Sequence, residues 1–236
     1  MSLFSLIFPQ VCPICGRYVG EKAMRGQLCE SCISSLPRTE QAAIRENGTE
    51  MALWGEAQSK AAAKRVMHLD HAASFLFYEK DHPIRSAIHK MKYADQPMIG
   101  YWLGRQAAME MLYADFFDEI EVIVPMPLHP KRLRERGYNQ AEYIANGISE
   151  ITGIPVDTAH VTRARNTPKQ ALQRGEERKA NVAEAFTVNH PEQMYHKHIL
   201  VVDDLVTTGE TMRSCLKAMK RFRGATFSVF ALCKAR

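Results

Sequence analysis

The sequence Ile199-Leu-Val-Val-Asp-Asp-Leu-Val-Thr-Thr-Gly-Glu-Thr211 places two adjacent acids, Asp203 and Asp204, after an apolar run. The apolar residues predict a buried strand over 198–202. Residues 211–222 predict a helix, because their apolar positions follow the helical period. In open α/β sheets, ligands bind outside the carboxyl ends of the strands. We therefore expect the loop between this strand and this helix to form a binding site.

The side chains of the loop indicate what the site would bind. Hydroxyl groups, a glycine and free backbone N–H groups at the start of a helix make an anion site. Adjacent carboxylates suit polar hydroxyls, or a hard cation such as Mg²⁺. Together these groups predict a phosphosugar ligand. The alternative is an ordinary strand–loop–helix junction in which Asp and Thr only cap the helix.

Strands and helices alternate on the N-terminal side of this loop and after it. Short apolar runs predict strands at 72–78, 120–125, 181–188, 198–202 and 225–232. Apolar residues at helical spacing predict helices at 83–91, 99–113, 138–151 and 211–222. This order predicts an α/β fold with a mostly parallel sheet flanked by helices.

Four of the six cysteines lie near the N-terminus, as Cys12-Pro-Ile-Cys15 and Cys29-Glu-Ser-Cys32. Two C-x-x-C pairs at this spacing predict a structural zinc site, because each pair can present two thiolates from one tight turn. Four thiolates leave no position for water, so this metal should do no chemistry. The alternatives are two disulfides or four unconnected structural cysteines. Cys215 and Cys233 stand alone in apolar surroundings and are expected in the core.

These patterns divide the chain into a small zinc ribbon at 1–40, a connector at 41–70 and the α/β domain at 71–236. The connector has mixed charge and no clear strand alternation. A chain of 236 residues suits one core domain with a small appendage.

Composition excludes several classes of protein. Hydrophobic residues make up 46% and charged residues 24%, so the chain can form a core and is not disordered as a whole. No window approaches 18 consecutive apolar residues, which argues against a membrane span. The apolar start, Met1 to Pro9, lacks the basic region and cleavage site of a secretory signal. We therefore expect a cytoplasmic protein.

The positive charge is unevenly distributed. The net charge of +5 permits an anionic partner without requiring one. Residues 129–180 hold ten Lys and Arg against six Asp and Glu, so most of the excess lies there. Arginine recognises phosphates in a bidentate manner, and the segment therefore suits a polyanionic ligand such as a diphosphate.

The stretch 199–211 closely resembles the phosphoribosyl diphosphate (PRPP) motif of type I phosphoribosyltransferases. The resemblance implies that Asp203 and Asp204 hold the ribose 2′ and 3′ hydroxyls and that Mg²⁺ accompanies PRPP. It also implies a cradle for the 5-phosphate, made by Thr207, Thr208, Gly209 and Thr211.

The order of motifs along nearly the whole chain resembles the ComF family of bacterial competence proteins. A zinc ribbon is followed by Pro-Met-Pro-Leu-His-Pro at 125–130, by Arg-Gly-Tyr-Asn-Gln at 136–140, by a basic segment at 163–181 and by the PRPP motif. The resemblance implies a diphosphate-contacting loop with Pro127, Leu128 and His129, joined by Arg136. It also implies a mobile catalytic loop at 163–181, with Arg165, Thr167 and Gln170.

The resemblance implies a role in natural transformation, in which single-stranded DNA enters the cytoplasm with the help of the competence machinery. The alternative is an active PRPP-dependent phosphoribosyltransferase with an unknown acceptor, and the residues leave open whether any group is transferred. Aromatic residues such as Trp102 and Tyr138 are candidates for stacking on single-stranded DNA. Their alternative role is to pack in the core.

Overall fold

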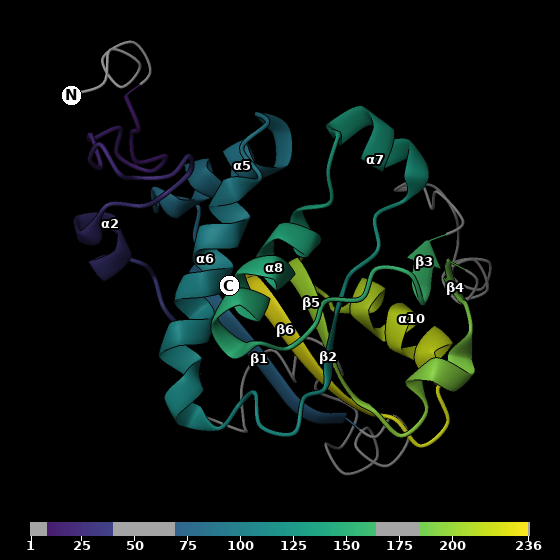
Figure 1. Cartoon of the computed structure of the whole chain (residues 1–236). Helices are drawn as coiled ribbons and strands as arrows, with labels where there is room; N and C mark the ends of the chain where they lie inside the picture. The colour runs from purple at the N-terminus through teal and green to yellow at the C-terminus, as the bar shows by residue number, and fades with distance from the viewer. Residues whose placement is uncertain (1–8, 40–68, 164–184, 236) are drawn as a thin grey trace.

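Four parallel strands form the main sheet, in the order β1-β6-β5-β2 (Figure 1). The computed structural model describes residues 9–39, 69–163 and 185–235. The main strands are β1 (Leu69–Tyr78), β2 (Val122–Pro125), β5 (His198–Val206) and β6 (Thr226–Ala235). The longer helices are α5 (Ile84–Tyr93), α6 (Met98–Met111), α8 (Gln140–Thr152) and α10 (Glu210–Met219). Shorter elements are α2 (Glu30–Ser34), α7 (Pro130–Arg136), η1 (Leu112–Ala114), η2 (Pro191–Met194), β3 (Val161–Arg163) and β4 (Phe186–Val188).

The sheet separates two apolar clusters, because successive side chains of a strand point to opposite faces. In β5, Leu200 and Val202 join the cluster formed with α5, α6 and α8. Ile199 and Val201 join the cluster formed with α10. The predicted α/β architecture, a mostly parallel sheet flanked by helices, is therefore confirmed.

Two strands differ from the sequence prediction. β5 continues to Val206, beyond the predicted end at residue 202, because its parallel pairing with β6 extends to the Val206–Lys234 pair. Asp203 and Asp204 therefore lie within the C-terminal part of the strand and not in the loop. The strand predicted at 181–188 is β4, which pairs antiparallel with β3 in a separate two-stranded sheet. Residues 181–184 lie outside the described part of the chain.

Helices α6 and α8 pack unusually close together at two glycines. A Cβ atom on Gly104 would overlap the carbonyl oxygen of Ile144, and one on Gly147 would overlap that of Tyr101. The absence of side chains at both positions therefore lets the two backbones touch. This contact fixes α6 against α8 on one face of the sheet.

Residues 9–39 pack on the outer side of α6, away from α10 (Figure 1). Leu28 and Leu36 are buried in the same cluster as α5 and α6. The end of this segment also pairs with the sheet edge, since the Thr39 N–H donates to the Phe75 carbonyl at 3.0 Å. Arg38 forms a two-pronged ion pair with Glu110 of α6, at 2.6 and 2.7 Å. The N-terminal segment thus shares the core of the α/β domain.

Within the described ranges, no helix is both long and apolar enough to cross a bilayer.

Candidate ligand pocket and four-cysteine site

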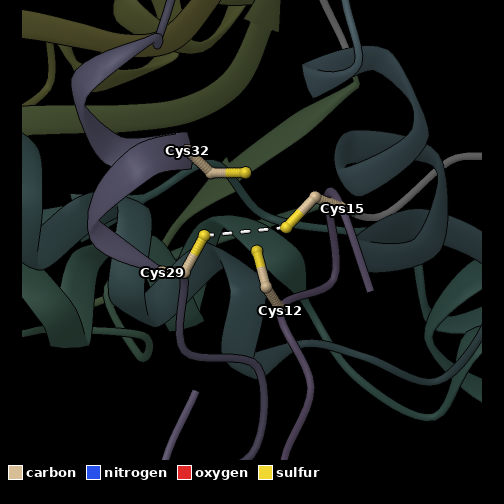
Figure 2. Close-up of side chains that lie close together, drawn as sticks. All are labelled: Cys12, Cys15, Cys29 and Cys32. Carbon is tan, nitrogen blue, oxygen red and sulfur yellow. Dashed lines mark hydrogen bonds between the residues drawn. The ribbon is translucent and has the colours of Figure 1, made fainter. Parts of the chain in front are cut away.

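The four N-terminal cysteines converge on one point, as Figure 2 shows. The Sγ atoms of Cys12, Cys15, Cys29 and Cys32 all lie within 4.8 Å of one another. The first pair sits on a tight turn in which the Gly16 N–H donates to the Cys12 carbonyl at 2.8 Å, with Gly16 at φ 74°. In the second pair, Cys29 is the N-cap of α2 and Cys32 lies in its first turns. Two chain reversals therefore present two thiols each to a shared centre.

The donor set fits a structural zinc ion. Four sulfur ligands at a Zn–S distance of about 2.3 Å would have tetrahedral edges of about 3.8 Å. The Sγ atoms of Cys15 and Cys29 are 3.6 Å apart, close to that edge length. A backbone hydrogen bond at Arg17 lowers the pKa of the exposed Cys15 thiol to about 7, which favours the thiolate that binds metal. The predicted four-cysteine cluster is therefore present and is compatible with zinc.

A second site lies at the C-terminal ends of the main strands. A cavity of about 190 Å³ opens there, between α5, α7, α8 and the end of β5. Six residues predicted for the ligand site line it: Pro127, Leu128, Arg136, Asp203, Asp204 and Thr211. The topology thus brings together residues from three separate motifs of the sequence.

The two acids face opposite sides of β5, as neighbouring residues in a strand must. Asp204 is 5% exposed, and its Oδ1 lies 3.0 Å from Nζ of Lys92 on α5. Its other oxygen, Oδ2, is buried and has no hydrogen-bond partner within the described ranges. Asp203 lies toward Arg163 of β3, and its Oδ1 accepts a hydrogen bond from the Asp204 N–H at 2.8 Å.

Burial and the neighbouring Asp204 carboxylate raise the pKa of Asp203 to about 7, while Lys92 and Arg163 act in the opposite direction. Burial, together with the nearby Arg132, lowers the pKa of Arg163. The pocket therefore holds two adjacent acids, of which Asp203 has a raised pKa, with Lys92 and Arg163 supplying opposite charge from two sides.

The Arg-Gly-Tyr-Asn-Gln motif at 136–140 builds the wall of the pocket. Gly137, at φ 84°, ends α7, and the Asn139 side chain caps α8 by accepting a hydrogen bond from the Ala141 N–H. The Asn139 amide also donates to the carbonyl of Met126 at 3.1 Å, which ties the 125–130 loop to α8. Arg136 is hydrogen-bonded to Gln140. The motif thus positions the loop and directs Arg136 into the pocket.

Other predicted residues lie outside this cavity. Thr207 and Thr208 are exposed in the loop before α10, and Gly209 is the N-cap of that helix at φ 70°. His129 caps α7, where its Nδ1 accepts from the Lys131 N–H at 3.1 Å. The predicted catalytic residues Arg165, Thr167 and Gln170 fall outside the described part of the chain.

The cavity also contains side chains that were not among the predicted site residues: Lys92, Tyr93, Arg132, Asn139, Gln140 and Arg163. Lys92 and Tyr93 are the last residues of α5. The apolar periodicity of that helix predicts only which residues are buried, so no sequence pattern identified these two. Arg132 and Arg163 lie in the segment of excess positive charge, which was the available signal.

Both aromatic candidates for DNA stacking make contacts within the protein, and Trp102 is only partly buried. Tyr138 is buried, and its hydroxyl donates to the Met91 carbonyl of α5 at 2.6 Å. The Trp102 Nε1–H donates to the carbonyl of Arg25 at 3.3 Å, and Arg105 lies over its ring. Cys215 and Cys233 are fully buried, as expected of core residues.

Several known proteins are similar to this chain in sequence. Residues 136–236 match the family of phosphoribosyl transferase domains. The DNA utilization protein YhgH of Shigella flexneri is 31% identical over 155 residues, which are 64% of this chain and 67% of that protein. Competence protein F of Haemophilus influenzae is 27% identical over 162 residues, 65% of this chain and 69% of that protein.

A similar solved structure is the glutamine PRPP amidotransferase of B. subtilis in complex with ADP and GMP. It is 19% identical with a TM-score of 0.39, and the match covers 56% of this chain and 26% of that enzyme. The parallel sheet, the cysteine cluster, the matched domain and the identity to YhgH agree with one another. The chain therefore belongs to the ComF family of competence proteins and carries a phosphoribosyltransferase domain.

Proposed function

We propose that the pocket at the end of β5 binds PRPP together with Mg²⁺, and that the protein supports uptake of single-stranded DNA. The observation that carries the proposal is Oδ2 of Asp204, a buried carboxylate oxygen without a hydrogen-bond partner in the described ranges. A buried acceptor left without a partner costs about 1–3 kcal/mol. A ribose hydroxyl entering the pocket would donate to it.

The charges around the pocket favour an anion over a bare cation. Four cationic side chains line the cavity against two carboxylates: Lys92, Arg132, Arg136 and Arg163. A free divalent cation would be repelled by this excess, whereas a diphosphate would be attracted. Mg²⁺ would therefore enter with the diphosphate and neutralise charge on its oxygens.

The start of α10 supports a position for the 5-phosphate. Gly209 caps this helix without a side-chain hydrogen bond, so the first N–H groups remain directed toward the loop. The hydroxyls of Thr207 and Thr208 are exposed beside them, and Thr211 faces the cavity. A phosphate at this place would meet backbone donors, hydroxyls and the positive end of the helix dipole.

The biological role rests on the family. The relatives are named for DNA utilization and for competence. We infer that this protein acts in the same process, with single-stranded DNA and the competence machinery as partners. We also place it in the cytoplasm, where a cluster of four thiols stays reduced and able to hold zinc.

Calorimetric titration with PRPP, with and without Mg²⁺, tests the ligand. We expect Mg²⁺-dependent binding by the wild type and its loss in the double variant Asp203→Asn/Asp204→Asn. The exposed Asp118→Asn is the matched control and should bind like the wild type. Absence of binding by the wild type under both conditions would refute the proposal.

The same samples can separate binding from turnover. Phosphorus NMR of PRPP with the protein and a panel of candidate acceptors reports release of diphosphate. Release that depends on an acceptor and on Asp203 and Asp204 would establish the alternative, an active phosphoribosyltransferase. Binding without release would leave a PRPP-binding protein.

A further inference from the structure

The last turn of α5 contributes Lys92 and Tyr93 to the cavity at the end of β5. Nζ of Lys92 lies 3.0 Å from Oδ1 of Asp204, and the two side chains are 16% and 7% exposed. A pair this buried differs from a surface ion pair, because removal of one partner leaves an uncompensated buried charge. The pair therefore belongs to the organisation of the pocket.

Only one of the two carboxylate oxygens of Asp204 has a polar partner within the described residues. Oδ1 meets Lys92, whereas Oδ2 is buried and finds no hydrogen-bond partner in the described residues. A carboxylate held at one oxygen cannot turn freely, so its second oxygen keeps one direction. Asp204 lines the cavity, and its Oδ2 is an acceptor without a partner among the described residues; hydrogen bonds to a carboxylate are about twice as strong as neutral ones.

We propose that Lys92 is a positioning residue that balances the negative charge of the acid pair and holds Asp204 so that Oδ2 accepts a hydrogen bond from a ligand hydroxyl. This inference rests on the proposed function, in which the ligand carries a ribose. The role is distinct from that of Arg132 and Arg136, which would attract the diphosphate.

The helix that carries Lys92 is itself fixed in place. The apolar face of α5, formed by Ile84, Ala87, Ile88 and Met91, is buried against the sheet and α6. The carbonyl of Met91 accepts from Tyr138, and Nζ of Lys90 donates to the Pro13 carbonyl at 2.7 Å. The two residues before Lys92 are thus anchored, so a rigid part of α5 holds the Lys92 ammonium beside Asp204.

Other charged groups surround the acid pair but do not replace Lys92. Arg163 of β3 faces Asp203, Arg132 and Arg136 of α7 line the mouth of the cavity, and the buried thiols of Cys215 and Cys233 lie behind the two acids. Within the described residues, Lys92 is the cation that forms an ion pair with Asp204. Loss of its charge would therefore raise the pKa of Asp203 further, since Lys92 is one of the two cations that lower it.

Binding of PRPP with Mg²⁺, measured by calorimetry from pH 6 to pH 9, tests this role. We expect Lys92→Met to weaken binding about five- to tenfold at pH 7, because a rise of one unit in the pKa of an acid cuts its ionised fraction by up to tenfold. The deficit should shrink toward pH 9, and Lys92→Arg should restore most of the affinity at pH 7. Arg85→Met, on the exposed side of α5, should match the wild type at every pH.

Two outcomes would overturn the inference. One is wild-type affinity of Lys92→Met across the whole pH range. The other is a deficit that is the same at every pH and is not relieved by Lys92→Arg, since that pattern describes a merely structural side chain.

A ligand-free measurement separates this inference from the proposed function. If the wild type does not bind PRPP, the proposed function fails, yet thermal unfolding against pH still reports on Lys92. The stability of Lys92→Met should fall more steeply than that of the wild type between pH 6 and pH 9. Parallel stability curves would contradict the role of Lys92.

Discussion

Asp203 and Asp204 are neighbours in one strand but experience different surroundings. Asp204 is paired with Lys92 at 3.0 Å. Asp203 has no such direct ion pair within the described ranges, and burial beside a second carboxylate raises its pKa to about 7. A group whose pKa is higher in the folded state binds protons more tightly there, so folding stability falls as the pH rises from about 4 to about 7. Ionisation of Asp203 is therefore less favourable in the folded protein than in the unfolded chain.

Replacement of Asp203 by Asn should remove the loss of folding stability that accompanies ionisation of Asp203. At pH 8, where Asp203 is ionised, Asp203→Asn removes the buried charge and should raise the free energy of unfolding by about 1 kcal/mol or more. The gain should largely disappear near pH 4, where the carboxyl is protonated in the folded state and about half protonated in the unfolded chain. Thermal unfolding from pH 4 to pH 8 measures it, with the exposed Asp118→Asn as control. A destabilised Asp203→Asn at pH 8 would argue against the raised pKa.

At the scale of elements, the contact between α6 and α8 sets the position of the pocket wall. Gly104 and Gly147 allow the two helix backbones to touch. Because α8 begins at Gln140, the last residue of the 136–140 motif, its placement also determines where Arg136 and Asn139 lie. Packing between these helices is therefore linked to the geometry of the site.

Gly147→Ala should disturb this contact. The added methyl group would meet the Tyr101 carbonyl, and overpacking of this kind costs about 1–3 kcal/mol. Asn146→Ala, at the exposed neighbouring position of α8, should instead be neutral or slightly stabilising because alanine favours helices. Denaturant unfolding of both variants makes the comparison. Equal stability of Gly147→Ala and the wild type would show that the helices can separate freely.

At the scale of the whole molecule, the cysteine cluster and the α/β domain share one core. Cys12, Leu28, Cys32 and Leu36 are buried in the same cluster as α5 and α6. The first cysteine turn also contacts α5 directly, through the hydrogen bond from Lys90 to Pro13. A metal that stabilises the N-terminal segment should therefore also stabilise the packing around the pocket.

Removal of zinc should lower the stability of the entire protein in a single transition. A structural metal contributes its binding free energy to folding, and here the folded segment is continuous with the main core. Calorimetric melting with and without a chelator should show one peak at a lower temperature, and added zinc should restore it. An unchanged main peak with a separate small transition would mean that the N-terminal segment folds independently. Cys15→Ser, at an exposed ligand position, should reproduce the effect of the chelator without creating a cavity.

The predictable part of the fold came from local patterns. Short apolar runs marked β1, β5 and β6, and apolar residues at helical spacing marked the helices between them, because buried strands and half-buried helices impose these patterns on the chain. Local patterns did not predict where β5 ends. It extends to Val206 because it pairs with β6, which is a contact between distant segments. The cysteine spacing marked the four-cysteine cluster for the same local reason, since each short segment holds two of its thiols.

The sequence by itself determined the α/β class, the four-cysteine cluster and the strand that carries Asp203 and Asp204. These features follow from residues close together in the chain. Only the tertiary structure decided that Lys92 pairs with Asp204, that Arg163 faces Asp203, and that one oxygen of Asp204 remains without a partner in the described residues. The physical reason is that such contacts join segments that meet only after α5 and β3 have packed against the end of the sheet.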